Sequence, residues 1–360
     1  MTFEEIALDP HTPLRAAREG GREAVGYVCS YVPVELIHAG GFIPVRLLIG
    51  PPPGDTAGMY MQGFCCSFAR SLLEGVGDGT FDYLSAIVMP HTCDTIRNMS
   101  DLLDTVDPEL RVFKLMVPTV THTDEAVEFM VEELRVLKCG LEELASREIS
   151  EADLEESIEL YNRVRAALEE LQEKNLDNRE LYAAYLSAQL MDPEDFLSLA
   201  HALEAGPERA DGMGVALVGG PVPQLDIFDL LQEYDMRVAW DDLCTASRFA
   251  AGAVAKEAEP LRALAERYLR RTPCPTKLDP GNRREETLLR GVADSGAAGV
   301  VFMQQNFCEF HSFDYPHLKK RLDAEGIPSI RLDLEQPFQP TGQMRTRLQA
   351  LSEILAERVW

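Results

Sequence analysis

Eight short apolar runs, four toward each end of the chain, constrain the fold more than any other feature of the sequence. They are almost continuously apolar, which is typical of strands buried on both faces of a parallel sheet. The first four are VGYVCSY (25–31), PVRLLIG (44–50), YLSAIVMP (83–90) and RVFKLMVP (111–118). The other four are GVALVGG (214–220), MRVAWDDL (236–243), AGVVFMQQNF (298–307) and PSIRLDLE (328–335).

Helical segments lie between these runs. Residues 33–41 (PVELIHAGG) end in two glycines, which suit the C-terminus of a helix. Residues 67–77 and 94–105 provide two further segments. Strands that alternate with helices predict an α/β fold with a parallel sheet, of the Rossmann- or flavodoxin-like kind.

The two ends of the chain follow the same plan. VGYVCSYVPVELIHAGGFIPVRL corresponds to VALVGGPVPQLDIFDLLQEYDMRVAW as strand, Val-Pro turn, helix and strand, and YLSAIVMPHTC corresponds to AAGVVFMQQNFC. The correspondence is architectural and not letter by letter. We therefore expect two related parallel-sheet domains around a cleft: a first α/β domain with a helical N-terminal lead-in over residues 1–122, and a second over residues 212–360.

The segment between these domains, residues 123–211, has a different character. Its stretches TDEAVEFMVEELRVLKCGLEELA and ISEADLEESIELYNRVRAALEELQ carry apolar residues at helical spacing. Ser150 and Asp153 form a capping pattern at the start of the second stretch. The pattern predicts an acidic, all-helical linker or insert.

Charge and composition exclude several classes of partner. The chain has 34 Lys and Arg against 60 Asp and Glu, a net charge of −26, which disfavours nucleic acid and anionic membrane surfaces. The first twenty residues lack the apolar core of a signal peptide, and no apolar stretch is long enough to span a membrane. We expect a cytoplasmic protein, in which eight cysteines are more often metal ligands or catalytic groups than disulfides.

Two of the cysteines fall at matching places in the repeat. Cys93 and Cys308 each follow the third apolar run of their half, at the strand ends where parallel sheets bind ligands. Cys65 and Cys66 precede a segment with Arg70, a setting that favours the thiolate. No CxxC pair occurs, and free cysteine is also a common core residue, so the spacing alone leaves both a metal site and a structural role open.

Several segments together resemble the 2-hydroxyacyl-CoA dehydratase and benzoyl-CoA reductase family. They occur in the family's order and cover the chain from about Gly26 to its end. They are GYVCSYVPVELIHAGGFIPVRL (26–47), CSFAR (66–70), CDTIRN (93–98), FC (307–308) and GQMRTRLQALSEIL (342–355).

The resemblance implies a 4Fe–4S cluster held between two α/β domains by three cysteines, which match Cys66, Cys93 and Cys308. Cys66 is preferred to Cys65 because the family places a cysteine four residues before the arginine. Three protein ligands leave one iron open for water or substrate. The implied reaction is a radical dehydration of (R)-2-hydroxyacyl-CoA to 2-enoyl-CoA, started by one-electron reduction of the thioester, with the cluster supplying the electron.

The resemblance also implies partners. Family enzymes pair two paralogous subunits as a heterodimer, act on acyl-CoA substrates and receive electrons from an ATP-dependent iron–sulfur activator protein. This chain has no GxxxxGK(S/T) phosphate-binding loop, which fits the catalytic subunit and not the ATPase. Three alternatives stay open: a benzoyl-CoA reductase-type subunit, a double-cubane-cluster reductase of small molecules that would use more cysteines, and a non-catalytic partner subunit.

Other polar residues near these motifs have two interpretations each. Ser30, after the first run, is the candidate catalytic residue, because its hydroxyl would lie at the same cleft edge; it is otherwise a turn residue. Arg70 and Arg97 are candidate donors to cluster sulfur or members of surface ion pairs. His91 and His311 flank the proposed ligands and are candidate bases or simply polar loop residues.

The other cysteines are interpreted as structural. Cys29 ends an apolar run and Cys139 lies in the helical segment. Cys244 and Cys274 are given the same interpretation, except that either would become a ligand in the double-cubane alternative.

Overall fold

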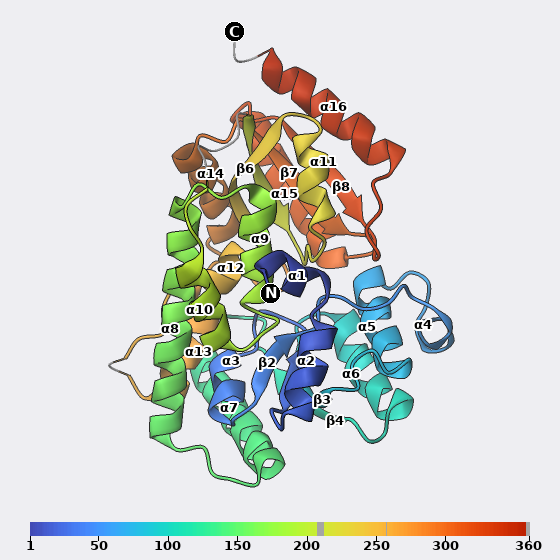
Figure 1. The fold of residues 1–360 in the computed structure, drawn as a ribbon. Coiled ribbons are helices and arrows are strands. Elements are labelled where there is room, and N and C mark those ends of the chain that lie inside the picture. The colour runs from blue at the N-terminus through green and yellow to red at the C-terminus, as the bar shows by residue number, and fades with distance from the viewer. Residues whose placement is uncertain (207–211, 257, 358–360) are drawn as a thin grey trace.

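Two four-stranded parallel sheets form the frame of the protein in the computed structural model, which describes residues 1–206, 212–256 and 258–357 (Figure 1). The first sheet has the order β2-β1-β3-β4 and the second the order β6-β5-β7-β8. The strands of the first sheet are β1 (Ala24–Tyr27), β2 (Ile43–Arg46), β3 (Leu84–His91) and β4 (Arg111–Met116). Those of the second are β5 (Met213–Gly219), β6 (Met236–Leu243), β7 (Gly299–Gln305) and β8 (Ser329–Leu334).

This topology confirms the predicted fold class and the internal repeat. In each half the first strand pairs with the second and the third, and the third pairs with the fourth, always in parallel. Each of the eight apolar runs overlaps a strand. Of the four edge strands, β2 is buried, whereas β4, β6 and β8 are only partly buried, so the expectation of burial on both faces does not hold for these three.

The inner strands of the second sheet come close together because β5 ends in glycine. A Cβ atom on Gly219 would lie 2.0 Å from the carbonyl oxygen of Met303 on β7, far inside van der Waals contact. A side chain at this position would push the two strands apart just where they reach the ligand-binding edge of the sheet.

Helices cover both sheets and connect their strands. Those of the first half are α1 (Phe3–Leu8), α2 (His11–Glu19), α3 (Val34–Ala39), α4 (Asp55–Tyr60), α5 (Ser67–Gly77) and α6 (Asp94–Val106). Those of the second half are α11 (Asp226–Gln232), α12 (Ser247–Ala250), α13 (Pro260–Arg270), α14 (Arg283–Ser295), α15 (Glu309–Ala324) and α16 (Gly342–Ala356).

The middle of the chain is helical, as predicted. It contains α7 (Asp124–Ala145), α8 (Glu151–Glu173), α9 (Asn178–Ser187) and α10 (Pro193–Ala202). Ser150 and Asp153 form the expected capping box at the start of α8. Helix α8 packs against α3 and α10, and α7 packs against α13, so these green helices flank both halves in Figure 1. The expected boundary at residue 211 lies outside the described residues.

Contacts between the two halves join the ends of their strands. Arg46 at the end of β2 donates hydrogen bonds to the carbonyl oxygen and the sulfur of Cys244, directly after β6. The amide of Gln336, after β8, donates to the Ser67 hydroxyl at the start of α5 (2.9 Å). The carboxyl ends of the two sheets therefore face a common junction, which is where the cysteines lie.

Candidate functional site

The three predicted ligand cysteines all occupy the residue directly before a helix. Cys66 precedes α5, Cys93 precedes α6 and Cys308 precedes α15. Cys93 and Cys308 follow β3 and β7, the equivalent strands of the two halves, as the repeat predicted. Each sulfur therefore lies at the positive end of a helix dipole, which favours the thiolate over the thiol.

The same three thiols interact electrostatically in all three pairs. Cys66 is coupled to Cys93, Cys93 to Cys308, and Cys308 to Cys66. Such interactions require proximity, because solvent and dissolved ions screen charges over about 10 Å. The structure thus brings together three segments separated by up to 242 positions in the sequence.

Burial controls the protonation of these thiols in the metal-free chain. It raises the pKa of each of the three to about 12. The backbone amide three residues along each helix acts in the opposite direction; these are the amides of Ala69, Ile96 and His311. None of these amides makes a full capping hydrogen bond to the sulfur. The thiols are therefore protonated until a metal replaces the protons.

The donor set available to a metal or cluster at the junction consists of cysteine thiols, with two unpartnered polar atoms in the same segments. Among the described residues, no group of three His, Cys, Asp or Glu is placed to bind one metal ion. A single ion needs its donor atoms within about 2.0–2.6 Å of one point, whereas cysteines around a cluster bind different irons. Two nearby polar atoms, Arg70 Nε and His91 Nδ1, are buried and have no hydrogen-bond partner in the described part of the chain, as expected beside an anionic group.

Ser30 lies beyond the end of β1, in a turn closed by the Val32 amide and the Cys29 carbonyl (3.0 Å). It is buried, and Arg271 from the other half of the chain holds it through Nη2, 2.6 Å from its carbonyl oxygen and 3.1 Å from its hydroxyl. Strand β1 ends at Tyr27, earlier than the apolar run suggested. Ser30 therefore lies after the strand, near the junction.

Three further cysteines act on the same group of thiols; the sequence analysis gave them a structural role and kept Cys244 and Cys274 open only as ligands of a double cubane. The thiol of Cys29 is coupled to those of Cys244 and Cys274, and Cys308 is coupled to Cys244 and Cys274 as well. Cys29 and Cys244 follow the ends of β1 and β6. The strand-end position of Cys244 was visible in the sequence, and the same argument applies to Cys29, whereas the loop position of Cys274 gives no such signal.

Two buried cations accompany these additional thiols. Arg46 Nη2 lies 3.2 Å from the Cys244 sulfur, and the Arg46 side chain is 1% exposed. Burial lowers the pKa of Arg46, but the thiols of Cys244 and Cys29 counteract it, and the pKa ends above its usual value. Lys277 donates a hydrogen bond to the carbonyl oxygen of Val117 (3.1 Å), and burial lowers its pKa to about 8, against the opposite influence of Cys29, Cys274 and Cys93. The junction is therefore rich in thiols and positive charge.

The two candidate histidines have different environments. His311 is neutral, because burial and the nearby guanidinium groups of Arg284 and Arg248 lower its pKa to about 3. Its Nε2 faces Gly220 at the end of β5. His91 is held by Ser100, whose hydroxyl oxygen lies 3.4 Å from Nε2, and burial lowers its pKa.

The remaining candidates lie farther from the junction or at its rim. Arg97 is exposed on α6. Cys139 is exposed on α7, in agreement with its predicted place in the helical segment. Cys65 is partly buried beside Cys66, and its sulfur lies 3.9 Å from the side-chain oxygen of Gln62.

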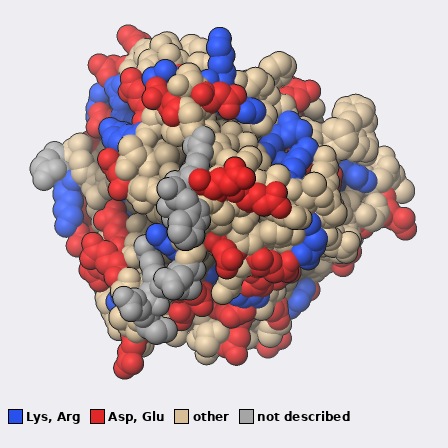
Figure 2. Space-filling view, turned by 90° about the horizontal axis from the view of Figure 1, so that it is seen from above, with Lys and Arg blue, Asp and Glu red and all other residues tan. Residues whose placement is uncertain are grey.

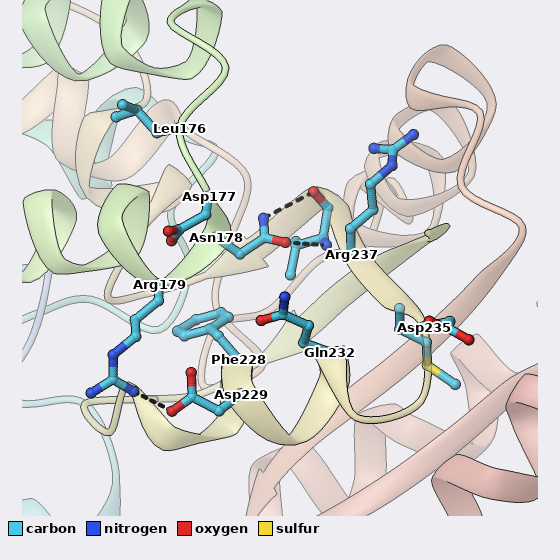
Figure 3. Close-up of a pocket in the computed structure, with 11 residues that line it drawn as sticks. Leu176, Asp177, Asn178, Arg179, Phe228, Asp229, Gln232, Asp235 and Arg237 are labelled. Carbon is cyan, nitrogen blue, oxygen red and sulfur yellow. Dashed lines mark hydrogen bonds and ion pairs between the residues drawn. The ribbon is translucent and has the colours of Figure 1, made fainter. Parts of the chain in front are cut away.

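A separate pocket of about 330 Å³ lies away from the cysteines, between α9, α11 and β6 (Figure 3). Its polar side chains are largely engaged with one another: Asn178 exchanges two hydrogen bonds with the backbone of Val238, and Arg179 pairs with Asp229. The contacts of Asn178 cover the edge of β6. The described residues that line this pocket include no cysteine or histidine.

On the face seen in Figure 2, acidic and basic side chains are intermixed, with several acidic patches. A search of the described helices finds none that is both long enough and apolar enough to cross a membrane. Taken together, the fold and the site define a two-sheet α/β protein whose strand ends converge on a buried, thiol-lined junction.

Comparison with known proteins gives the family. The family model described as 2-hydroxyglutaryl-CoA dehydratase, D-component, matches residues 29–355. The chain belongs to this family. It is 29% identical to the beta subunit of (R)-2-hydroxyglutaryl-CoA dehydratase from Acidaminococcus fermentans, over 98% of both chains. It is 28% identical to the lactoyl-CoA dehydratase beta subunit of Anaerotignum propionicum, over 98% of this chain and 97% of that one.

The similarity extends to a reductase. One of the subunits of benzoyl-CoA reductase from Thauera aromatica is 25% identical, over 86% of this chain and 84% of its own length. The relatives confirm the resemblance of the sequence motifs and establish an enzyme-type subunit.

Proposed function

We propose that this chain is the iron–sulfur subunit of a 2-hydroxyacyl-CoA dehydratase-type enzyme, with a 4Fe–4S cluster held by Cys66, Cys93 and Cys308. The observation that carries the proposal is the position of these three cysteines, each directly before a helix (α5, α6 and α15) at the junction of the two sheets. When bound, the cluster would supply one electron to an (R)-2-hydroxyacyl-CoA, which would lose hydroxide and its β-proton and give the electron back, so that the net reaction is the loss of water to the 2-enoyl-CoA.

In this proposal Ser30 contacts the substrate. Its hydroxyl oxygen accepts a hydrogen bond from Arg271, so its own proton is available for the thioester carbonyl or the departing hydroxyl. The positive guanidinium makes the serine a better donor to an oxygen that gains negative charge. The low pKa of His311, about 3, makes it a poor acceptor for the β-proton, so of the two candidate histidines His91 is the preferred base in this proposal.

We further propose that the chain forms a heterodimer with a paralogous subunit and that an ATP-dependent iron–sulfur protein activates the enzyme. The names of the relatives as beta subunits support the first of these partners. Exposed phenylalanines also lie beside the ligand cysteines: Phe64, Phe307 and Phe313 are 68%, 57% and 83% exposed. Phe307 has φ +62°, a strained conformation for a bulky residue that is typical of functional turns.

We retain the domain division at residues 1–122, 123–211 and 212–360 and a cytoplasmic location as parts of this proposal. The helices between the sheets begin at Asp124, close to the first proposed boundary. Eight free cysteines suit a reducing compartment.

Iron and sulfide analysis of the anaerobically purified protein tests the function. The wild type should carry about four irons per chain, and Cys66→Ser, Cys93→Ser and Cys308→Ser should each lose most of them. Cys139→Ser is the matched control, because its thiol is exposed on α7, and it should keep its iron. A wild type without iron, or ligand variants with full iron, would refute the assignment.

A double-cubane cluster is the second candidate, favoured by the convergence of Cys29, Cys244 and Cys274 with the first three thiols. It predicts about eight irons per chain, and it predicts that Cys244→Ser and Cys274→Ser lose iron as well. If those two variants keep four irons, the second candidate is wrong and the three-cysteine site stands.

A further inference from the structure

Gln336 carries a buried side-chain amide with an unused hydrogen-bond donor. It lies two residues after the end of β8 and is 5% exposed. Its side-chain nitrogen, Nε2, is enclosed and has no hydrogen-bond partner in the described part of the chain. An amide donor buried without an acceptor destabilises the fold. A group of this kind in a folded protein is explained by an acceptor that binds to the finished fold.

The backbone around Gln336 joins two turns that carry proposed ligands. Its own amide donates to the hydroxyl oxygen of Ser67 (2.9 Å), the first residue of α5. On the other side of the same segment, the carbonyl oxygen of Leu334 accepts from the amide of Asn306 (3.0 Å), in the turn before Cys308. The segment therefore contacts the start of α5 and the turn that leads into α15.

Further contacts fix the end of β8 against that turn. Gln305, the last residue of β7, is paired in register with Leu334, and its carbonyl oxygen accepts from the amide of Cys308 (3.1 Å). The side-chain nitrogen of Asn306 donates to the carboxylate of Glu335 (2.6 Å). The end of β8 and the turn into α15 are therefore held as one unit.

The side chain of Gln305 has an unused atom of the opposite kind. Its Nε2 donates to the carbonyl oxygen of Pro221 (3.0 Å), whereas its Oε1 is buried without a partner among the described residues. The ends of β7 and β8 thus leave one donor and one acceptor free. Thiolates and sulfides only accept hydrogen bonds, so the nitrogen of Gln336 suits them and the oxygen of Gln305 does not.

We propose that Gln336 donates a hydrogen bond through Nε2 to a sulfur of the iron–sulfur site, while its backbone holds together the turns that carry Cys66 and Cys308. This inference rests on the proposed function, because it needs a cluster at these cysteines. It adds a residue that belongs to none of the sequence motifs and that binds neither iron nor substrate.

The sign of its effect on the reduction potential follows from the polarity of the hydrogen bond. Reduction makes the cluster sulfurs more negative, so a donor stabilises the reduced form more than the oxidised form. Gln336→Met removes the donor, keeps an unbranched side chain of similar length and retains the backbone amide that binds Ser67. We expect its cluster to be about tenfold harder to reduce, a negative shift of about 59 mV for a one-electron couple.

The experiment compares Gln336→Met, Gln336→Glu and Gln189→Met with the wild type. Gln336→Glu replaces the donor with a carboxylate oxygen and should shift the potential in the same direction. Gln189 is the matched control, because it is 1% exposed and its side-chain nitrogen donates to the carbonyl oxygens of Tyr185 (2.7 Å) and Thr245 (2.9 Å).

Three quantities are measured anaerobically. A redox titration followed by electron paramagnetic resonance gives the potential of the loaded chain. Pulsed electron paramagnetic resonance in D2O gives the coupling of exchangeable deuterons to the reduced cluster. Thermal unfolding gives the Tm of the iron-free chain. The first two report on the cluster and the third on the fold, so a general loss of stability is recognised separately.

For both Gln336 variants we expect a more negative potential and the loss of an exchangeable deuteron coupling, whereas Gln189→Met should lower the Tm and keep both cluster properties. Loss of iron from a Gln336→Met chain whose iron-free Tm equals that of the wild type would also support the proposal.

A loaded Gln336→Met with the potential and couplings of the wild type would show that the amide serves the protein itself, and it would overturn this inference alone. Loss of iron together with a lower Tm of the iron-free chain would indicate a structural role and overturn it as well. A wild type that binds no iron would overturn the proposed function, and this inference with it.

Discussion

Arg271 donates two hydrogen bonds to Ser30, with Nη2 2.6 Å from the carbonyl oxygen and 3.1 Å from the hydroxyl oxygen. The guanidinium carbon lies 4.6 Å from the ring centre of Tyr31, and Nη1 donates to the carbonyl oxygen of Arg248 (2.9 Å). Because a guanidinium only donates hydrogen bonds, Ser30 keeps its own proton for another acceptor. The contact therefore orients the hydroxyl without consuming it.

Ser30→Ala should reduce turnover without loss of the cluster. The variant keeps the carbonyl that receives the stronger Arg271 contact, so the turn should remain folded. Loss of one donor to a developing negative charge costs about 10²–10³ in kcat. The measurement pairs iron content with the rate of 2-hydroxyacyl-CoA dehydration in the assembled enzyme.

Ser187→Ala is the matched control for this prediction. The Ser187 hydroxyl is also buried and donates to the Phe3 carbonyl oxygen at 2.9 Å, so its loss should cost about 1 kcal/mol of stability and no activity. A Ser30→Ala enzyme that turns over like the wild type would show that Ser30 is a turn residue.

The buried ion pair between Glu35 and Arg165 should dominate the acid sensitivity of the fold. The two side chains are 0% and 2% exposed, and Tyr268 donates to the other carboxylate oxygen of Glu35 (2.8 Å). Burial raises the pKa of Glu35, but Arg165 and Arg267 outweigh it and hold the pKa below 4.5. A carboxyl group whose pKa is lower in the native state than in the unfolded state stabilises the native state above pH 4.5. This contribution is lost as the pH falls through the native pKa.

Glu35→Gln should therefore cost about 3–5 kcal/mol near neutral pH, because it leaves Arg165 buried and unpaired. Its stability should also fall less steeply than that of the wild type below pH 4.5. Urea unfolding between pH 3 and 7 measures both effects. Glu132→Gln, which breaks the exposed pair with Arg135, should change stability by less than about 0.5 kcal/mol; equal losses in the two variants would contradict the prediction.

The fold was predictable because both halves repeat one pattern of apolar runs and connecting segments. That repeat also located Cys93 and Cys308 correctly, after equivalent strands. What the pattern did not determine is where the strands end. Strand β1 stops at Tyr27 although the apolar run continues to Tyr31, because the chain turns at Cys29 with a backbone hydrogen bond from Val32.

The surroundings of the site were less predictable, because they arise from long-range contacts. Arg46 occupies a run that resembles a buried strand, and nothing local indicates that its guanidinium reaches Cys244, 198 residues later. Lys277 and Cys274 come from a proline-rich loop whose position depends on the packing of α13. A sequence pattern shows which residues repeat locally. Which distant side chain a charged residue contacts depends instead on how the strands and helices are arranged in the fold.

Gly219→Ala should disrupt the second sheet near the site. The new methyl group would lie 2.0 Å from the Met303 carbonyl oxygen, and backbone cannot move aside as a side chain can. We expect a loss of about 1–3 kcal/mol, typical of overpacking, and weaker iron retention, because β7 leads to Cys308. Gly79→Ala gives a comparison: nothing lies within 4 Å of its Cβ, although its φ of +81° adds local strain. That variant should lose stability and keep its iron.

The exposed phenylalanines beside the proposed ligand cysteines should be needed for association with the proposed companion subunit. Phe313 on α15 is 83% exposed, and Phe307 directly precedes Cys308. Exposed aromatic side chains in water are unfavourable, and they commonly form the core of an interface. Phe313→Asp should therefore weaken the heterodimer at least about tenfold, by loss of about 1.4 kcal/mol or more, while the isolated chain keeps its Tm and iron.

Phe129→Asp is the matched control, because Phe129 lies on α7 and is 46% exposed; this variant should leave association unchanged. Light scattering of the co-expressed subunits measures the effect, and dimers of equal affinity in both variants would place the interface elsewhere.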